Sequence, residues 1–99
     1  TASLSKYSAD TMIRCQMTII NALGLHARAA TKLARLTGSF ACQVRAGSDA
    51  LVDAKSVMSL MLLAASQGTV LTFEFDGEDE VIAEEKVRAL IANFFDEGG

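Results

Sequence analysis

The sequence is poor in the residues that build metal sites and hydrolytic sites. It has two cysteines, one histidine, and no tryptophan or proline. Cys15 and Cys42 form no CxxC pair and stand in the apolar phase of two separate strand candidates, so we expect reduced core residues and no metal. The single histidine, His26, has no second histidine or acid–base pair near it in the sequence, which argues against a hydrolytic enzyme.

Long hydrophobic runs are also missing. No segment is long enough to cross a bilayer, and none is flanked like a secretion signal, although 51% of the residues are hydrophobic. The formal net charge is -3 and basic residues are not interleaved with aromatic ones, which argues against nucleic acid as a partner. The length of 99 residues suits one domain. We therefore expect a soluble, cytoplasmic monomer that contacts no membrane.

Periodicity divides the chain into a short polar segment and one domain. Residues 1–11 are polar and without periodicity, so we expect a disordered extension before a domain that spans residues 12–99. The patterns that follow predict strands at 13–20, 40–46, 50–53 and 69–75, and helices at 27–37, 57–65 and 80–95. This βαββαβα order predicts an α+β fold, a four-stranded antiparallel sheet with the helices packed on one face.

The same phases predict which side chains form the core. The expected core residues are Ile13, Cys15, Met17, Ile19, Ala30, Leu33, Ala34, Phe40, Cys42, Val44, Leu71, Phe73, Phe75, Val87, Leu90, Ile91 and Phe94. Acidic residues gather in the opening turns of the last predicted helix, where negative charge complements the helix dipole. We expect a solvated face there, and no metal or catalytic site, at Glu78, Asp79, Glu80, Glu84 and Glu85.

The most informative stretch lies where a strand-like run gives way to a helical one, at Gly24-Leu25-His26-Ala27-Arg28. The first N–H groups of a helix lack partners within it, so an anion is stabilised there. The same field, with Arg28, favours a neutral and nucleophilic His26 ring. Arg28 would hold phosphoryl oxygens, and Gly24 would let a partner approach the backbone closely. An ordinary cap or surface histidine is the alternative that spacing alone leaves open.

Two blocks of the sequence resemble the HPr family, the histidine-containing phosphocarriers of the bacterial phosphotransferase system. The first resembles the family's active-site signature, and the second, followed by Leu60, Leu63 and Ala64, resembles its regulatory-serine segment. The blocks are Asn21-Ala22-Leu23-Gly24-Leu25-His26-Ala27-Arg28-Ala29-Ala30 and Lys55-Ser56-Val57-Met58. The resemblance covers residues 13–95 and implies an open-faced sandwich. Many members have proline where this chain has Ala29, so a less rigid first helical turn is expected.

The resemblance also implies a role for each residue of the first block. His26 would accept a phosphoryl group on Nδ1 from enzyme I, itself charged by phosphoenolpyruvate, and pass it to an EIIA-type protein, with Arg28 as the clamp. The chain would be a carrier and not a multiple-turnover enzyme, and would need no metal or organic cofactor. The form Asn-x-Leu-Gly-Leu-His-Ala-Arg is similar to proteobacterial members of nitrogen-type or regulatory systems, which leaves sugar uptake and regulation both open.

Basic residues form a stripe along the first predicted helix. Arg28, Lys32 and Arg35 recur at helical spacing and share one face that runs away from His26. On a chain of net charge -3, this alignment predicts a docking surface for acidic partner proteins. Ordinary solvated side chains are the alternative.

Ser56 is predicted to cap the second helix. The resemblance implies phosphorylation of Ser56 by an HPr kinase/phosphorylase in some branches of the family, which would add negative charge to the partner-binding face and weaken docking to enzyme I. The helix that follows is too apolar to be buried on all sides, so Met58 and Met61 are expected to be exposed; a core position is the alternative. We expect partner contacts at Gly24, Lys32, Arg35, Lys55, Val57, Met58 and Met61.

Two other classes of function fit the residues less well. A regulatory interaction module controlled through Ser56 would leave His26 as a vestigial surface residue, and the presence of both His26 and Arg28 argues against it. A small phosphatase would need a group that activates water, and the sequence offers no obvious one.

Overall fold

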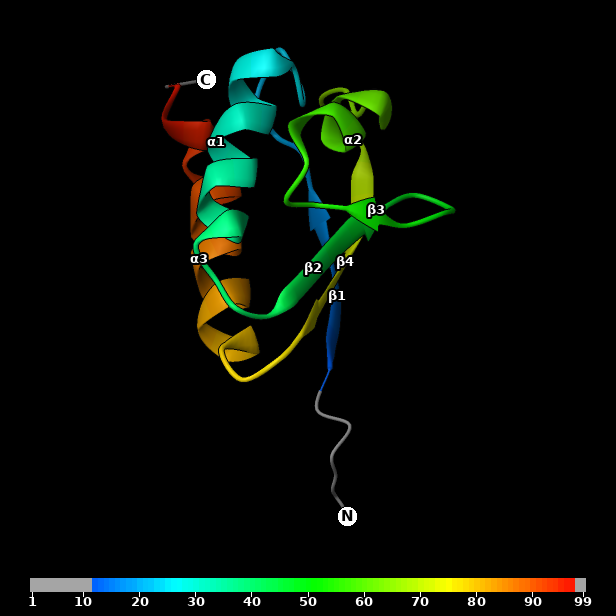
Figure 1. Ribbon diagram of the computed structural model, residues 1–99. Coiled ribbons are helices and arrows are strands. Elements are labelled where there is room, and N and C mark those ends of the chain that lie inside the picture. The colour runs from blue at the N-terminus through cyan, green and yellow to red at the C-terminus, as the bar shows by residue number, and fades with distance from the viewer. Residues whose placement is uncertain (1–11, 98–99) are drawn as a thin grey trace.

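The computed structural model describes residues 12–97. The predicted extension at 1–11 lies outside the described residues. The βαββαβα order is confirmed, and a short 3-10 turn follows the last helix (Figure 1). The elements are β1 (Ile13–Thr18), α1 (Ala27–Gly38), β2 (Gln43–Gly47), β3 (Val52–Asp53), α2 (Val57–Leu62), β4 (Val70–Asp76), α3 (Glu80–Ala92) and the turn η1 (Phe94–Asp96).

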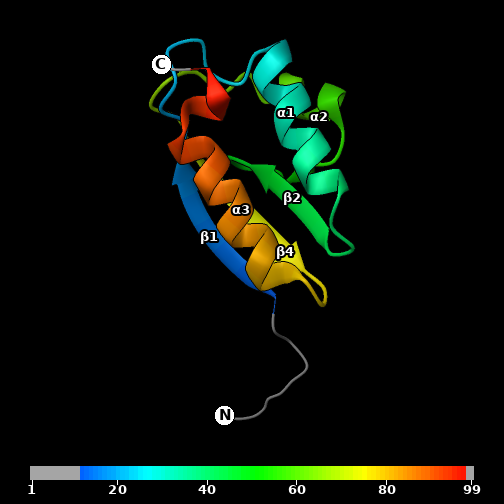
Figure 2. The same cartoon turned by 90° about the vertical axis from the view of Figure 1, so that its left-hand side faces the viewer.

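The sheet is antiparallel throughout and has the strand order β1-β4-β2-β3. The central strand β4 pairs with β1 on one side and with β2 on the other, so that Phe75 lies opposite both Ile13 and Val44. Figure 2 shows α1 and α3 side by side over one face of the sheet. The predicted α+β open-faced sandwich is confirmed.

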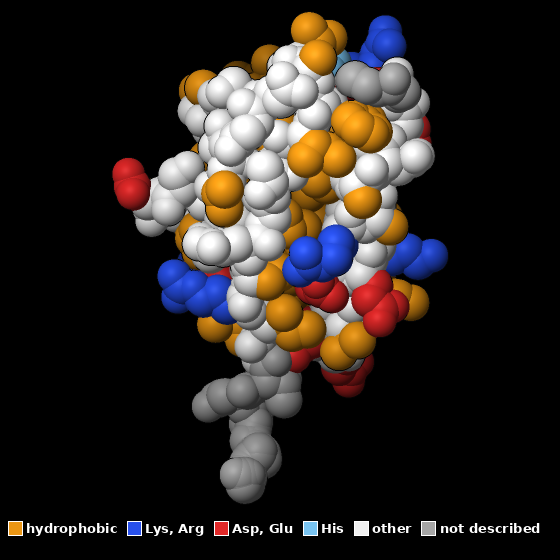
Figure 3. Space-filling view, turned by 180° about the vertical axis from the view of Figure 1, so that it is seen from behind, with side chains coloured by type: hydrophobic (Ala, Val, Ile, Leu, Met, Phe, Trp, Pro, Cys, Tyr) orange, Lys and Arg blue, Asp and Glu red, His pale blue; other side chains and the backbone are white. Residues whose placement is uncertain are grey.

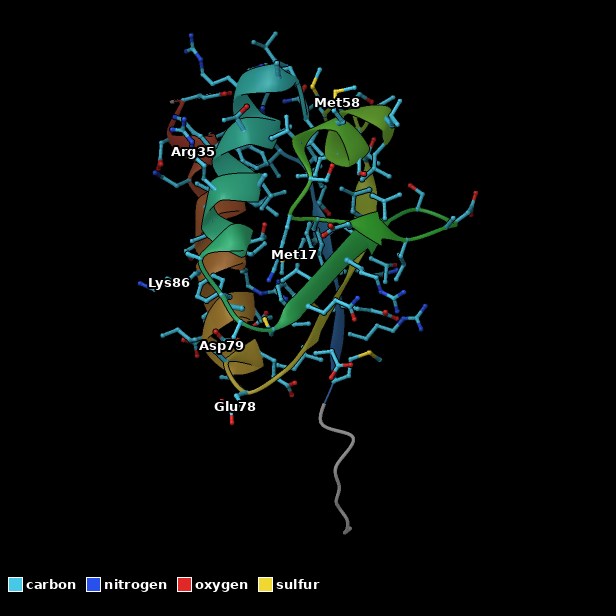
Figure 4. All side chains as sticks on the ribbon, in the orientation of Figure 1. Met17, Arg35, Met58, Glu78, Asp79 and Lys86 are labelled. Carbon is cyan, nitrogen blue, oxygen red and sulfur yellow. The ribbon has the colours of Figure 1, made fainter. Side chains whose placement is uncertain are left out.

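The core lies between the sheet and the helices. Phe73 and Phe75 are fully buried and stack with ring centroids 6.0 Å apart. Met17 points from β1 into the same space (Figure 4). From α1 come Leu33 and three alanines, Ala29, Ala30 and Ala34, whose small side chains let the helix pack close to its neighbours. Four predicted core residues lie at the margin, half-buried against this cluster: Ile13, Cys15, Phe40 and Leu90.

The end of the last helix corrects the prediction. The helix ends at Ala92 instead of residue 95, because Phe94, Phe95 and Asp96 have φ values of 57, 53 and 62°. This left-handed turn reverses the chain, and the side chain that enters the core is therefore Phe95, which is fully buried, while Phe94 is only half-buried. Non-glycine residues rarely adopt this conformation, and no glycine or proline marks the turn in the sequence.

The acidic cluster contains a second correction. Glu80 is 4% exposed, and its Oε1 accepts the Gly77 N–H at 2.9 Å, so the predicted solvated face is wrong for this residue. Asp79 accepts the backbone N–H groups of Ala41 and Cys42, both at 2.8 Å. These two amides bind a carboxylate instead of a neighbouring strand, and β2 accordingly begins at Gln43 and not at residue 40.

Three further elements are shorter than predicted. The first strand, expected at 13–20, ends at Thr18. The strand expected at 50–53 is reduced to β3, Val52–Asp53. The helix expected at 57–65 ends at Leu62, because Ala64 has a φ of 52° and leaves the helical path.

The cysteines lie on opposite sides of β4, and both thiols are free. Burial raises the pKa of Cys42 to about 11 and raises the pKa of the half-buried Cys15 thiol as well.

Seen from behind, hydrophobic side chains line a groove that basic and acidic groups cross (Figure 3). A groove between β1 and α3 is lined by Met17, Ile20 and Ile91, with Arg88 beside it. None of the helices within residues 12–97 is long and apolar enough to cross a membrane.

Candidate functional site

His26 is the N-cap residue of α1. Its backbone is extended, with φ -78° and ψ -178°, so the helix begins at the next residue. The ring folds back over this start, and Nδ1 accepts the backbone N–H of Arg28 at 3.3 Å. The side chain is 29% exposed, so the ring is partly held and partly open to an incoming group.

Gly24 sets the approach to this cap. It is buried, its φ is +69°, and a Cβ there would lie 2.4 Å from the backbone oxygen of Ala65. That same oxygen accepts the N–H of Leu25 at 2.8 Å, which ties the loop before α1 to the segment after α2. This contact inside the molecule requires a glycine at position 24.

The second ring nitrogen of His26, Nε2, contacts a carboxylate that is distant in the sequence. Nε2 lies 2.9 Å from Oε2 and 3.2 Å from Oε1 of Glu97, a residue 71 positions away. Buried Asn21 donates from Nδ2 to the Gly24 oxygen at 2.8 Å and to Glu97 Oε1 at 3.4 Å. Glu97 is not predicted by any local pattern, because only the reversal of the chain at η1 brings it to the histidine.

These contacts assign the proton on the ring. A backbone N–H can only donate, so the nitrogen that faces Arg28 N must present a lone pair. An ionised carboxylate can only accept, so the nitrogen that faces Glu97 must carry the hydrogen. The hydrogen-bond pattern therefore assigns the Nε2–H tautomer to His26 and leaves the ring's lone pair on Nδ1.

The predicted basic stripe lies along one side of α1, beginning at this site. An open pocket beside the ring is lined by Leu23, Ala27, Arg28 and Glu97, and a second hollow continues past Arg28 to Lys32 and Arg35. Arg28 and Arg35 are exposed, and Arg35 projects outward from α1 in Figure 4. Lys32 is half-buried and donates from Nζ to the Phe95 oxygen at 2.9 Å, so it also fastens η1 to α1.

An exposed apolar surface lies on α2, next to the start of α1. Ser56 caps α2 as predicted, with Oγ accepting the Ser59 N–H at 3.2 Å. The predicted exposure of the methionines is confirmed: Met58 is 70% exposed and Met61 40%. Figure 4 shows Met58 at the end of the molecule where α1 begins. Leu23 and Leu62 are also exposed, at 73% and 79%.

Two other residues expected to contact partners are partly occupied inside the molecule. Val57 is half-buried and packs against the core. Lys55 is half-buried and donates from Nζ to the Phe40 oxygen at 2.8 Å.

Comparison with known proteins places these features in a family. The model of the phosphotransferase-system HPr component phosphorylation site matches residues 13–93. The phosphocarrier protein HPr of Cupriavidus necator is 51% identical over 88 residues, which cover 88% of this chain and 99% of that protein. The chain belongs to the HPr family. The phosphocarrier protein HPr of Pseudomonas putida is also 51% identical, over 85 residues that cover 84% of this chain and 94% of that protein.

Solved structures of HPr proteins have the same fold. The crystal structure of an HPr from Thermoanaerobacter tengcongensis matches with a TM-score of 0.82 and 35% identity, over 86% of this chain and 97% of that one. An HPr from Bacillus anthracis matches with a TM-score of 0.77 and 28% identity, over 81% and 96%. Similarity extends to a phosphocarrier protein NPr from Shewanella violacea, 39% identical over 88% of this chain and 97% of that protein. HPr-type and NPr-type relatives are thus both similar to the chain.

Proposed function

We propose that the chain is a phosphocarrier in which His26 accepts a phosphoryl group from enzyme I and passes it to an EIIA-type protein. The observation that carries the proposal is the orientation of the ring. Its Nδ1 lone pair faces the start of α1 at 3.3 Å from Arg28 N, and the pocket beside it is open. Membership of the HPr family supports the same role.

The proposed transfer is one displacement at phosphorus. Nδ1 gives up the hydrogen bond from the Arg28 N–H and its lone pair attacks the phosphorus atom. The bond between phosphorus and the donor atom of enzyme I breaks, and the electron pair of that bond leaves with the donor. Nε2 keeps its hydrogen, so no base has to remove a proton from His26. The N–H groups at the start of α1 and the exposed guanidinium of Arg28 would stabilise the phosphoryl oxygens.

Recognition of both partners would use the surface around the site. Leu23 lines the same pocket as Arg28, and a second hollow continues from Arg28 along α1 to Arg35. Met58, Met61 and Leu62 are exposed on α2. A partner with an apolar patch and an acidic rim fits this arrangement. Within the proposal the carrier is a cytoplasmic monomer, and its own chemistry needs no metal or organic cofactor. The identity of the acceptor protein decides whether the carrier serves a sugar-uptake or a nitrogen-type regulatory branch.

Phosphorylation of Ser56 by an HPr kinase/phosphorylase would regulate this docking. The Ser56 hydroxyl caps α2 at the edge of the exposed apolar surface. A phosphate there would be stabilised by the helix start and would place negative charge beside the surface that meets acidic partners.

The test is phosphorylation of the full chain in vitro. The protein is incubated with phosphoenolpyruvate, magnesium and enzyme I, and intact masses of the wild type and His26→Ala are compared at neutral and acid pH. We expect an acid-labile gain of one phosphoryl group in the wild type and none in the variant. If an enzyme I that phosphorylates a related HPr leaves the wild type unmodified, the carrier proposal is wrong and regulation through Ser56 becomes the better explanation.

A further inference from the structure

A half-buried carboxylate faces the reactive ring and has no part in the transfer described so far. The Glu97 side chain is 10% exposed, and both of its oxygens lie within 3.2 Å of His26 Nε2. Asn21 Nδ2 donates to one of these oxygens at 3.4 Å and also to the Gly24 oxygen at 2.8 Å. The carboxylate is thus held by the loop that leads into the cap.

The turn that presents Glu97 is kept in an unfavourable backbone conformation. Three consecutive residues with positive φ, Phe94 to Asp96, reverse the chain after α3. Phe95 is fully buried, and Lys32 Nζ donates to its backbone oxygen at 2.9 Å. Asn93 Nδ2 donates to Asp96 Oδ1 at 2.6 Å across the same turn. Because non-glycine residues avoid this conformation, these contacts are what maintain it.

We propose that Glu97 is the positioning residue of phosphoryl transfer, an inference that rests on the proposed carrier function. It keeps the hydrogen of His26 on Nε2, so that Nδ1 carries a lone pair that can attack once the Arg28 N–H releases it. It also compensates the positive charge that the ring gains as the Nδ1–phosphorus bond forms, because the attacking ring keeps its Nε2 hydrogen while Nδ1 gives up its electron pair to phosphorus.

The surrounding charges make this compensation useful. Arg28 and the start of α1 stabilise phosphoryl oxygens but oppose positive charge on the ring. Lys32, also on α1, points its ammonium at the Phe95 oxygen behind the site. Glu97 is negative and lies on the Nε2 side, away from the incoming group. The carboxylate therefore stabilises the transition state more than the neutral ground state, which is the condition for raising a rate.

The experiment compares Glu97→Gln, Glu97→Asp and Glu97→Ala with the wild type by single-turnover transfer from phosphorylated enzyme I. Gln can still accept the Nε2 hydrogen but carries no charge, so we expect the transfer rate at saturating enzyme I to fall about tenfold to hundredfold. The Ala variant should lose more, and Asp should recover part of the loss. The enzyme I concentration for half-saturation should change little, because Glu97 acts on the ring and not on the partner.

Nitrogen-15 NMR of the His26 ring supplies a second readout, independent of transfer. We expect the wild-type ring to give the signals of the Nε2–H tautomer and Glu97→Ala to give a mixture of both tautomers. Glu85→Gln is the matched control, since it removes one exposed negative charge on α3 outside the site. It should retain the wild-type rate and ring signals.

The outcomes separate the two proposals. If Glu97→Ala keeps the wild-type rate and the wild-type tautomer, the role of Glu97 is wrong while the carrier function stands. If the wild type accepts no phosphoryl group from a competent enzyme I, the carrier function is wrong, and the role of Glu97 in transfer is wrong with it.

Discussion

Single residues decide whether the cap at His26 forms at all. Gly24 has a left-handed φ of +69° and lies so close to the Ala65 oxygen that any side chain would collide with backbone. His26 caps α1 through one hydrogen bond, from Arg28 N to Nδ1, and the same nitrogen is the nucleophile in the proposed transfer. The backbone geometry therefore requires glycine at position 24, and His26 is needed for the helix cap as well as for its proposed chemistry.

Replacement of Gly24 by alanine tests this view. Gly24→Ala should lower the free energy of unfolding by about 2–3 kcal/mol, because the new Cβ meets the Ala65 backbone and the φ is strained. Urea unfolding followed by circular dichroism measures the change. Gly38→Ala is the control: it lies at the end of α1 with no atom near its Cβ position, and should leave stability unchanged or raise it. Equal stability of the two variants would contradict the argument.

At the scale of elements, α3 holds the start of β2 in place through one side chain. The Asp79 carboxylate binds the N–H groups of Ala41 and Cys42, and these bonds hold the pKa of Asp79 below its ordinary value of 3.8. A depressed carboxyl pKa in the folded state adds stability above the unfolded pKa. That contribution is lost as the pH falls below about 4 and through the lowered folded pKa.

Asp79→Asn should accordingly unfold at a lower urea concentration than the wild type at pH 7. The difference between the two midpoints should shrink as the pH is lowered below about 4, since the wild-type carboxylate is then protonated. Glu78→Gln removes the neighbouring charge, which is exposed in Figure 4, and should show no such convergence. A difference between Asp79→Asn and wild type that stays constant from pH 7 down to about pH 2.5 would exclude the ionised carboxylate as the cause.

The elements also show what the sequence can and cannot predict. Alternation in β1 and spacing in α1 predict the buried residues because each pattern is local and repeats. His26 and Arg28 are found for the same reason, as they adjoin a helix start. Glu97 is not found, since its position depends on a left-handed turn with no glycine to mark it and on contacts with α1 far away in sequence. Long-range contacts override local preference there.

At the scale of the whole molecule, the functional surface combines three parts of the chain. The start of α1, the exposed apolar side of α2 and the residue after η1 meet at one end of the domain. In Figure 1 the rest of the sheet and α3 extend away from that end. A charge added at the cap of α2 therefore acts on the same surface that carries Arg28 and Met58.

Ser56→Asp imitates that added charge. We expect transfer from enzyme I to slow severalfold at limiting enzyme I, through weaker association, and the effect to diminish as salt is raised. Stopped-flow or quench-flow transfer at two salt concentrations measures it. Ser48→Asp places the same charge on the exposed turn between β2 and β3 and should transfer like the wild type. An unchanged transfer rate with Ser56→Asp would count against regulation at this serine.

The strand order has a consequence for how the protein is made. The central strand β4 is the last strand to leave the ribosome, yet both β1 and β2 take it as a partner. Until residues 70–76 have been synthesised, β1 has no neighbour to pair with and β2 has only the short β3. The nascent chain must carry the apolar faces of its first strands uncovered until β4 emerges, so the sheet assembles only after residues 70–76 have been synthesised.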